Sequence, residues 1–159
     1  MTTDTAAPSA IERRLAELGI DLPEVSPALA SYIPVEVHGD TAFVSGQLPF
    51  LDGKIATGRL GADVDVERGI AIARACGLMI LAQLRAAGLL DRVAGIVKLG
   101  GFVASTPDFT DQHKVVNGAS DLMSEVFGDA GRHARAAVGV PALPLGAAVE
   151  VDAIVALRG

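Results

Sequence analysis

One arginine and one glutamate near the end of the chain have the residue types and the spacing that carboxylate chemistry needs. Arg135 and Glu150 lie fifteen positions apart, with two apolar runs on either side of the segment Pro141–Gly146. A guanidinium grips a carboxylate with two parallel hydrogen bonds, and a carboxylate side chain can orient or deprotonate a water molecule. The pair could therefore hold a small organic acid and act on water beside it.

We expect a β-hairpin to bring these two residues together. The segment Pro141–Gly146 contains two prolines and a glycine, which are typical of a reversal between strands. A hairpin centred between Ala142 and Leu143 places Arg135 directly opposite Glu150. Because side chains alternate along a strand, the hairpin should have one polar and one apolar face. The polar face would hold Arg135, Ala137, Gly139, Ala148, Glu150 and Asp152, and the apolar face Ala136, Val138, Val140, Val149, Val151 and Val155.

A simpler interpretation of the polar face stays open at this point. Arg135 and Glu150 could form a cross-strand ion pair on a solvated sheet, which contributes about 1 kcal/mol or less to stability. In that case the two residues would need no ligand. Spacing alone does not distinguish the two interpretations.

Two stretches of the tail resemble the C-terminal signature of the RidA family of imine and enamine deaminases, also known as YjgF or L-PSP endoribonuclease-like proteins. They are Arg135-x-Ala137-Val138-x-Val140-x-x-Leu143-Pro144 and Val149-Glu150-Val151-x-Ala153-Ile154. The resemblance implies that Arg135 binds the carboxylate of the substrate and that Glu150 acts on the attacking water. It also implies a chorismate-mutase-like trimer in which the sheets of three subunits pack as an inner barrel.

Further positions resemble the family's ligand cleft. Ser45-Gly46-Gln47 is similar to its SGQ segment, and Tyr32 is similar to its Tyr before the first strand. The resemblance implies that Tyr32, Ser45 and the aromatic Phe102 line the cleft, with Tyr32 and Ser45 acting across a subunit boundary. Without it, Tyr32 would be a boundary aromatic and Ser45 an ordinary strand-end serine. Ala137 departs from the family, because many deaminating members have Cys there; its backbone N–H can still donate.

Other candidate residues have weaker arguments for a functional role. Family members have an Asn soon after Asp-Phe, but Asn117 lies about a helical turn too far from Phe109 to inherit its role. His133, just before the signature, is either a residue of the cleft rim or an ordinary loop histidine. The pair Gly100-Gly101 lacks the context of a phosphate loop. The lone Cys76 lies in an apolar stretch typical of a core thiol.

The pattern of the whole chain predicts an α+β fold with two helices on one face of a mixed sheet. Residues 1–30 should form a leader and a short extra helix, and residues 31–159 a single RidA-like domain. We expect three helices: one capped by Ser9 and ending near Leu18, one capped by Asp65 and ending near Ala87, and one opened by residues 107–109 and ending near Phe127. An irregular connection is expected over 21–30, followed by a hairpin of Val35–His38 with Thr41–Ser45. The remaining expected strands are one from about Gly95 to Ala104, bulged at its paired glycines, and the two strands of the tail.

Composition limits the function classes. The chain has 159 residues, half of them apolar, and a formal net charge of −6 without a cluster of Lys or Arg, which argues against a nucleic-acid surface. We expect no membrane span, because Arg85 ends the long apolar run that follows Arg74, and no secretory signal, so a cytoplasmic location is expected. No Cys/His group has metal-ligand spacing, and no cofactor is expected. The mean hydropathy of +0.43 favours exposed apolar surface and an oligomer.

The resemblance implies hydrolytic deamination of reactive 2-imino or enamino acids to 2-keto acids and ammonia. Whether the chain is an enzyme stays open, because a non-catalytic protein that binds small carboxylates such as 2-keto acids would need the same arginine. A ribonuclease, suggested by the older family name, is disfavoured by the acidic charge.

Overall fold

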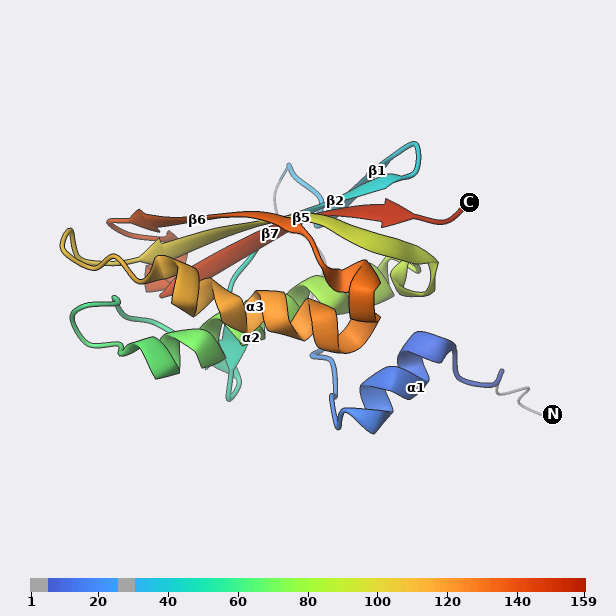
Figure 1. Cartoon of the computed structure of the whole chain (residues 1–159), viewed down its shortest axis with the longest axis horizontal. Coiled ribbons are helices and arrows are strands. Elements are labelled where there is room, and N and C mark those ends of the chain that lie inside the picture. The colour runs from blue at the N-terminus through green and yellow to red at the C-terminus, as the bar shows by residue number, and fades with distance from the viewer. Residues whose placement is uncertain (1–5, 26–30) are drawn as a thin grey trace.

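Five strands form a mixed sheet, and two helices cover one of its faces (Figure 1). The strands lie in the order β1-β2-β7-β5-β6, in which β5 and β6 run parallel and the other neighbours antiparallel. This computed structural model describes residues 6–25 and 31–159; residues 1–5 and 26–30, in the predicted leader and connection, lie outside the described residues. The predicted α+β arrangement is confirmed.

The elements follow one another with short connections. The sheet strands are β1 (Val35–His38), β2 (Thr41–Gln47), β5 (Val93–Ala104), β6 (Ala134–Val140) and β7 (Val149–Leu157), and a small ribbon consists of β3 (Phe50–Leu51) and β4 (Lys54–Ile55). The helices are α1 (Ala10–Glu17), α2 (Val66–Ala86) and α3 (Gln112–Phe127), and the short 3-10 turns are η1 (Leu90–Arg92), η2 (Gly128–Gly131) and η3 (Pro144–Gly146).

Helix capping agrees with the sequence at two of the three helices. The Ser9 hydroxyl accepts a hydrogen bond from the Glu12 N–H at 3.1 Å, and the Asp65 carboxylate accepts one from the Arg68 N–H at 2.7 Å. Helix α3 begins later than predicted, at Gln112. The segment before it first closes a turn, in which the Phe109 N–H donates to the Thr106 carbonyl.

The first hairpin is confirmed, and the position of the predicted bulge in β5 is wrong. The register of β1 and β2 pairs Val35 with Val44 and Val37 with Ala42. In β5 the irregularities against β7 lie between Val93 and Gly95 and between Ile96 and Lys98, whereas the two glycines at 100 and 101 pair regularly. The glycine at 101 serves close packing instead, since a Cβ there would overlap a side chain of α3.

The predicted hairpin of the last two strands is wrong. Strand β5 lies between β6 and β7, so these two strands are not paired with each other. Helix α3 brings the chain back parallel to β5, as crossover connections do. The Pro141–Gly146 segment is part of a longer crossing that passes the end of β5, where the Ala104 N–H donates to the Ala148 carbonyl. It therefore skips one strand instead of reversing tightly.

The long helix α2 is a core helix. By length and composition it could span a membrane, which corrects the expectation that no apolar run is long enough, but most of its apolar stretch is buried in this fold. Helices α2 and α3 lie side by side beneath the sheet in Figure 1, and α1 packs at their end, where Arg14 Nε donates to the Glu125 carbonyl at 2.9 Å.

The opposite face of the sheet is not covered by any helix of the described chain (Figure 1). Apolar side chains on it remain partly exposed: Phe43 of β2 is 44% exposed and Val138 of β6 is 45% exposed. We call this surface the open face and the other one the helix face. The core lies entirely on the helix face, where Val149, Val151 and Val155 of β7 are fully buried.

Candidate ligand-binding site

Sheet register places Arg135 and Glu150 on opposite faces. Arg135 of β6 is aligned with Leu99 of β5, which is fully buried against the helices. Glu150 of β7 is aligned with Phe102 of β5, and side chains three positions apart on one strand point to opposite faces. Arg135 therefore lies on the helix face and Glu150 on the open face. The predicted shared polar face and the simple cross-strand ion pair are both wrong.

The alternation of side chains along the strands also shows on which face of the sheet the other residues of β6 and β7 lie. The apolar Ala136, Val138 and Val140 of β6 lie on the open face, because Ala136 and Val138 are aligned with positions 100 and 102 of β5. Ala137 and Gly139 lie on the helix face with Arg135. The valines of β7 are core residues, as predicted.

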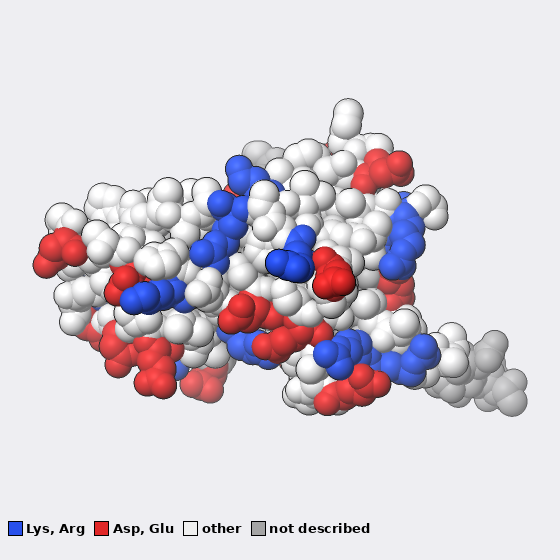
Figure 2. Space-filling view, viewed as in Figure 1, with Lys and Arg blue, Asp and Glu red and all other residues white. Residues whose placement is uncertain are grey.

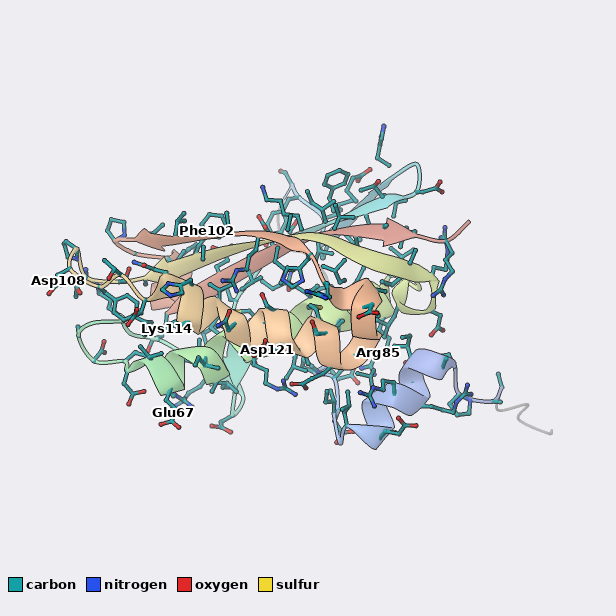
Figure 3. All side chains as sticks on the ribbon, in the orientation of Figure 1. Glu67, Arg85, Phe102, Asp108, Lys114 and Asp121 are labelled. Carbon is teal, nitrogen blue, oxygen red and sulfur yellow. The ribbon has the colours of Figure 1, made fainter. Side chains whose placement is uncertain are left out.

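Four of the six predicted site residues belong to the open-face half of the molecule or its margin. Glu150 and Phe102 are neighbours on adjacent strands, and Figure 3 labels Phe102 at the level of the sheet. Ser45 holds the segment before β1 in place, because its Oγ donates to the Ile33 carbonyl at 2.8 Å. Tyr32, next to that contact, is 61% exposed.

Gly46 makes room for the Glu150 side chain. A Cβ at position 46 would overlap Glu150 Oε1, so the carboxylate lies directly against the backbone of the Ser45-Gly46-Gln47 segment. The pairing of β2 with β7 is irregular between Val44 and Gln47, which is where this contact occurs. The predicted SGQ segment and the predicted Glu150 are thus brought together.

Electrostatics on the open face favour the protonated form of Glu150. Burial raises the pKa of this carboxyl group above its ordinary value, and the nearby negative Asp152 raises it further. Burial also raises the pKa of Asp152, while a backbone hydrogen bond at Gly100 and the positive Lys98 oppose that rise. A carboxylate with a raised pKa is a stronger base once it is ionised.

A hollow of about 410 Å³ on the open face adjoins these residues. Both Ser45 and Phe102 line it, and Asp152 and Lys98 bring opposite charges to it. Neither Arg135 nor Glu150 is among its lining residues, although Phe102, which lines it, is aligned with Glu150 on the neighbouring strand. The hollow therefore offers a molecule a wall of apolar atoms and the charges of Asp152 and Lys98, with Glu150 beside it on the same face, but within one chain it lacks the arginine.

Helix α3 holds the Arg135 side chain through three hydrogen bonds. Its Nη1 donates to Asn117 Oδ1 at 2.8 Å and to Ser120 Oγ at 3.1 Å, and its Nη2 donates to the His113 carbonyl at 3.2 Å. All three acceptors are neutral. Among residues 6–25 and 31–159, none of the ion pairs involves Arg135.

Within the described residues, the guanidinium keeps two donors for a ligand. Arginine has five N–H groups, and three of them are engaged with α3. The remaining two are the Nε–H and one Nη2–H, on adjacent nitrogens. Adjacent N–H groups of this kind can hold a carboxylate with two parallel hydrogen bonds. Ala137, two residues along on the same face, presents only a methyl group beside them.

Sequence reasoning missed the acceptors of Arg135. Asn117 lies too far from Phe109 to match the family's Asn, yet its side-chain oxygen is the nearest acceptor. A usable signal was the spacing of Asn117 and Ser120, since residues three positions apart share one side of a helix. Lys114 and Asp121, the labelled neighbours of this group in Figure 3, mark the course of α3 below the sheet.

His133 is an ordered part of the structure. Its Nδ1 lies 2.7 Å from the Gly131 carbonyl oxygen, and its Nε2 lies 2.9 Å from Ser120 Oγ. It is therefore linked to Arg135 through Ser120. In the described part of the chain, no group of three or more His, Cys, Asp or Glu side chains could hold a metal ion. Basic and acidic side chains lie interspersed over the side of the molecule shown in Figure 2.

Comparison with known proteins places this fold in a family. A family model described as YjgF/chorismate mutase-like, putative endoribonuclease, matches residues 12–157. Protein TCP17 of Trypanosoma cruzi is 52% identical over 151 residues, which cover 93% of this chain and 94% of that protein.

Solved structures of proteins with similar sequences have the same fold. Atu1372 from Agrobacterium tumefaciens, a protein of unknown function, is 50% identical; the match covers 94% of this chain and 92% of that chain, with a TM-score of 0.84. A structure from Shewanella oneidensis is 39% identical, with 92% and 99% coverage and a TM-score of 0.87. Escherichia coli TdcF, solved with bound serine, is 26% identical over 84% of this chain and 92% of its own, with a TM-score of 0.58.

Proposed function

This chain belongs to the YjgF/chorismate mutase-like family, the RidA family that its sequence resembles, and we propose that it hydrolyses reactive 2-imino and enamino acids to 2-keto acids and ammonia. The single observation that carries the proposal is the state of Arg135. Three neutral acceptors hold its guanidinium, no carboxylate of the described residues pairs with it, and two adjacent donors remain.

The free donors suit the common part of these substrates. A 2-imino acid carries a carboxylate beside its C=N carbon, and a fork of two N–H groups binds that carboxylate. The serine bound by E. coli TdcF is also a small carboxylate, which supports this ligand class for a relative of the same fold.

The reaction needs a second copy of the chain. Arg135 and Glu150 cannot serve one ligand from opposite faces of a single sheet, but β6 is an edge strand whose outer side is unpaired in the described chain. We propose a homotrimer in which Arg135 of one copy meets Glu150 of the next. The exposed Phe43 and Val138 support this assembly, since exposed apolar surface on a sheet favours association.

Glu150 is the group that handles water. In the proposed step, a water oxygen forms a bond to the C=N carbon while one water proton passes to Glu150 and then to the nitrogen. The resulting carbinolamine loses ammonia as its hydroxyl becomes the carbonyl, so one water is consumed for each ammonia released. The raised pKa of Glu150 suits it to accept and return that proton.

Neighbouring residues would position the substrate. Phe102 lies beside Glu150 and offers an apolar wall, Ser45 lines the same hollow, and Tyr32 precedes Ile33, whose carbonyl Ser45 binds. The methyl group of Ala137 leaves space next to Arg135 where a larger side chain would contact the ligand. We expect the backbone N–H of Ala137 to remain the polar group that this position contributes.

A coupled assay tests the proposal. A PLP-dependent threonine dehydratase generates the imine of 2-oxobutanoate, and the release of the keto acid is followed with and without this protein. The proposal predicts release faster than the spontaneous rate. Saturable binding of 2-oxobutanoate without acceleration would overturn it and identify the alternative, a non-catalytic carboxylate-binding protein.

A further inference from the structure

A continuous chain of hydrogen bonds leads away from Arg135 on the side that the ligand does not use. Arg135 Nη1 donates to Ser120 Oγ at 3.1 Å, Ser120 Oγ lies 2.9 Å from His133 Nε2, and His133 Nδ1 lies 2.7 Å from the Gly131 carbonyl oxygen. The four groups come from β6, α3, the segment before β6, and η2. None of these contacts is a backbone hydrogen bond between strands of the sheet.

For the neutral form of His133, the chemistry of the groups fixes the direction of every hydrogen bond. A carbonyl oxygen only accepts, so Nδ1 of His133 must carry a proton toward Gly131. In the neutral imidazole Nε2 then carries no hydrogen and accepts a hydrogen bond from the Ser120 hydroxyl. The hydroxyl hydrogen is thereby turned toward His133, and a lone pair of its oxygen is turned toward Arg135.

This direction matters because a serine hydroxyl is otherwise free to rotate. Without a hydrogen-bond acceptor at His133 Nε2, the Ser120 hydroxyl could rotate, and its lone pair would not be held toward the Arg135 guanidinium. With it, Nη1 has two fixed acceptors, Ser120 and Asn117, and Nη2 has one in the His113 carbonyl. Three acceptors around one planar group fix both its position and its plane.

We propose that Ser120 and His133 are positioning residues that aim the free edge of Arg135, its Nε–H and remaining Nη2–H, at the ligand carboxylate. This proposal rests on the proposed function, because it takes Arg135 as the carboxylate-binding group. Neither residue touches the reacting atoms. His133 acts through Ser120, and Ser120 acts through Arg135.

The role predicts a particular kinetic pattern. The carboxylate is held equally in the ground state and in the transition state, so a misplaced guanidinium weakens binding without slowing the chemical step. Ser120→Ala and His133→Phe should each raise both KM in the coupled assay and the Kd for 2-oxobutanoate by about tenfold. Their kcat should stay within about twofold of the wild-type value.

Matched variants separate positioning from a general effect on the fold. Ser120→Thr keeps a hydroxyl at the same place and should recover most of the lost affinity. Ser124→Ala changes another serine of α3 that is exposed to solvent, and should leave Kd and KM unchanged. Thermal denaturation of each variant shows whether its helix packing is intact.

A measurement on the unchanged protein keeps the test decisive if a variant fails to fold. Long-range proton–nitrogen NMR spectra of wild-type protein at pH 8 should show His133 as the tautomer with the proton on Nδ1 and none on Nε2. The opposite tautomer would reverse the hydrogen bond between His133 and Ser120, and would overturn the proposal.

The outcomes also distinguish this proposal from the proposed function. If Arg135→Lys weakens 2-oxobutanoate binding while Ser120→Ala and His133→Phe do not, only the positioning role fails. If Arg135→Lys has no effect either, the carboxylate site itself is elsewhere. Loss of kcat at unchanged Kd, together with covalent labelling of Ser120 by a fluorophosphonate, would identify Ser120 as a nucleophile and overturn positioning.

Discussion

Arg135 and Glu150 project from opposite faces of one sheet, and strand β5 separates the strands that carry them. Arg135 is bound by α3 on the helix face, and Glu150 lies against Gly46 on the open face. Two groups that must act on one small molecule cannot do so from these positions in a single chain. The proposed active site is therefore a property of the assembly.

The binding role of Arg135 predicts a large effect of a conservative change. Arg135→Lys keeps the positive charge but removes the pair of adjacent N–H donors, so the Kd for 2-oxobutanoate should rise at least about tenfold by titration calorimetry. Arg132→Lys, at an exposed position three residues away, is the matched control and should leave the Kd unchanged. Equal affinities for both variants would place the ligand away from Arg135.

The role of Glu150 predicts loss of turnover with retention of structure. Glu150→Gln should lower kcat by about 10²-fold to 10⁴-fold, because the amide cannot accept the water proton, while 2-oxobutanoate still binds. The raised pKa of Glu150 means that its stabilising contribution is complete at low pH and is lost as pH rises through the folded-state pKa. The uncharged Gln avoids that loss, so its Tm at pH 7 should equal or exceed the wild-type value. A lower Tm or a dissociated variant would indicate a structural role instead.

The neighbouring Asp152 predicts a shift in the pH profile. Burial is the main cause of the raised pKa of Glu150, and the negative charge of Asp152 adds to it. Asp152→Asn removes that charge and should lower the pKa of Glu150, so the acid limb of the kcat profile moves to lower pH. Asp121→Asn, on the exposed side of α3, is the control and should leave the profile in place. A shift to higher pH in Asp152→Asn would contradict Glu150 as the titrating base.

The contact between Gly46 and Glu150 predicts a steric effect on catalysis. A Cβ at position 46 would overlap Glu150 Oε1, so Gly46→Ala should displace the carboxylate and lower kcat by about tenfold or more. Gly159→Ala, where an added Cβ meets nothing within 4 Å, is the control. Wild-type kcat in Gly46→Ala would mean that the orientation of Glu150 in this structure is not the catalytic one.

Much of the fold could be predicted because its signals are local. Ser9 and Asp65 cap their helices, and the Gly39-Asp40 turn sets the register of β1 on β2. Such features depend on neighbours in the sequence. The family was likewise identified from the sequence, because the types and spacing of residues such as Arg135 and Glu150 resemble its signature.

The spatial arrangement of the site could not be predicted, because it depends on pairing between distant strands. Nothing near Arg135 or Glu150 indicates that β5, some 30 or more residues earlier, lies between their strands. The Pro141–Gly146 segment is as typical of a tight reversal as of a crossing connection. Asn117 was missed for a related reason, since its partner Arg135 lies on a different element and only the folded chain brings them within 2.8 Å.

Complementation between two inactive variants tests the shared site most directly. Arg135→Ala and Glu150→Gln are co-expressed in equal amounts, and the mixed oligomers are assayed with the dehydratase couple. If each site takes its arginine from one copy and its glutamate from the next, random mixing restores both groups in about one quarter of the sites, and activity should recover to about one quarter of wild type. The same variants expressed apart and mixed without subunit exchange should stay inactive. No recovery in the co-expressed oligomers would contradict a site built from two copies.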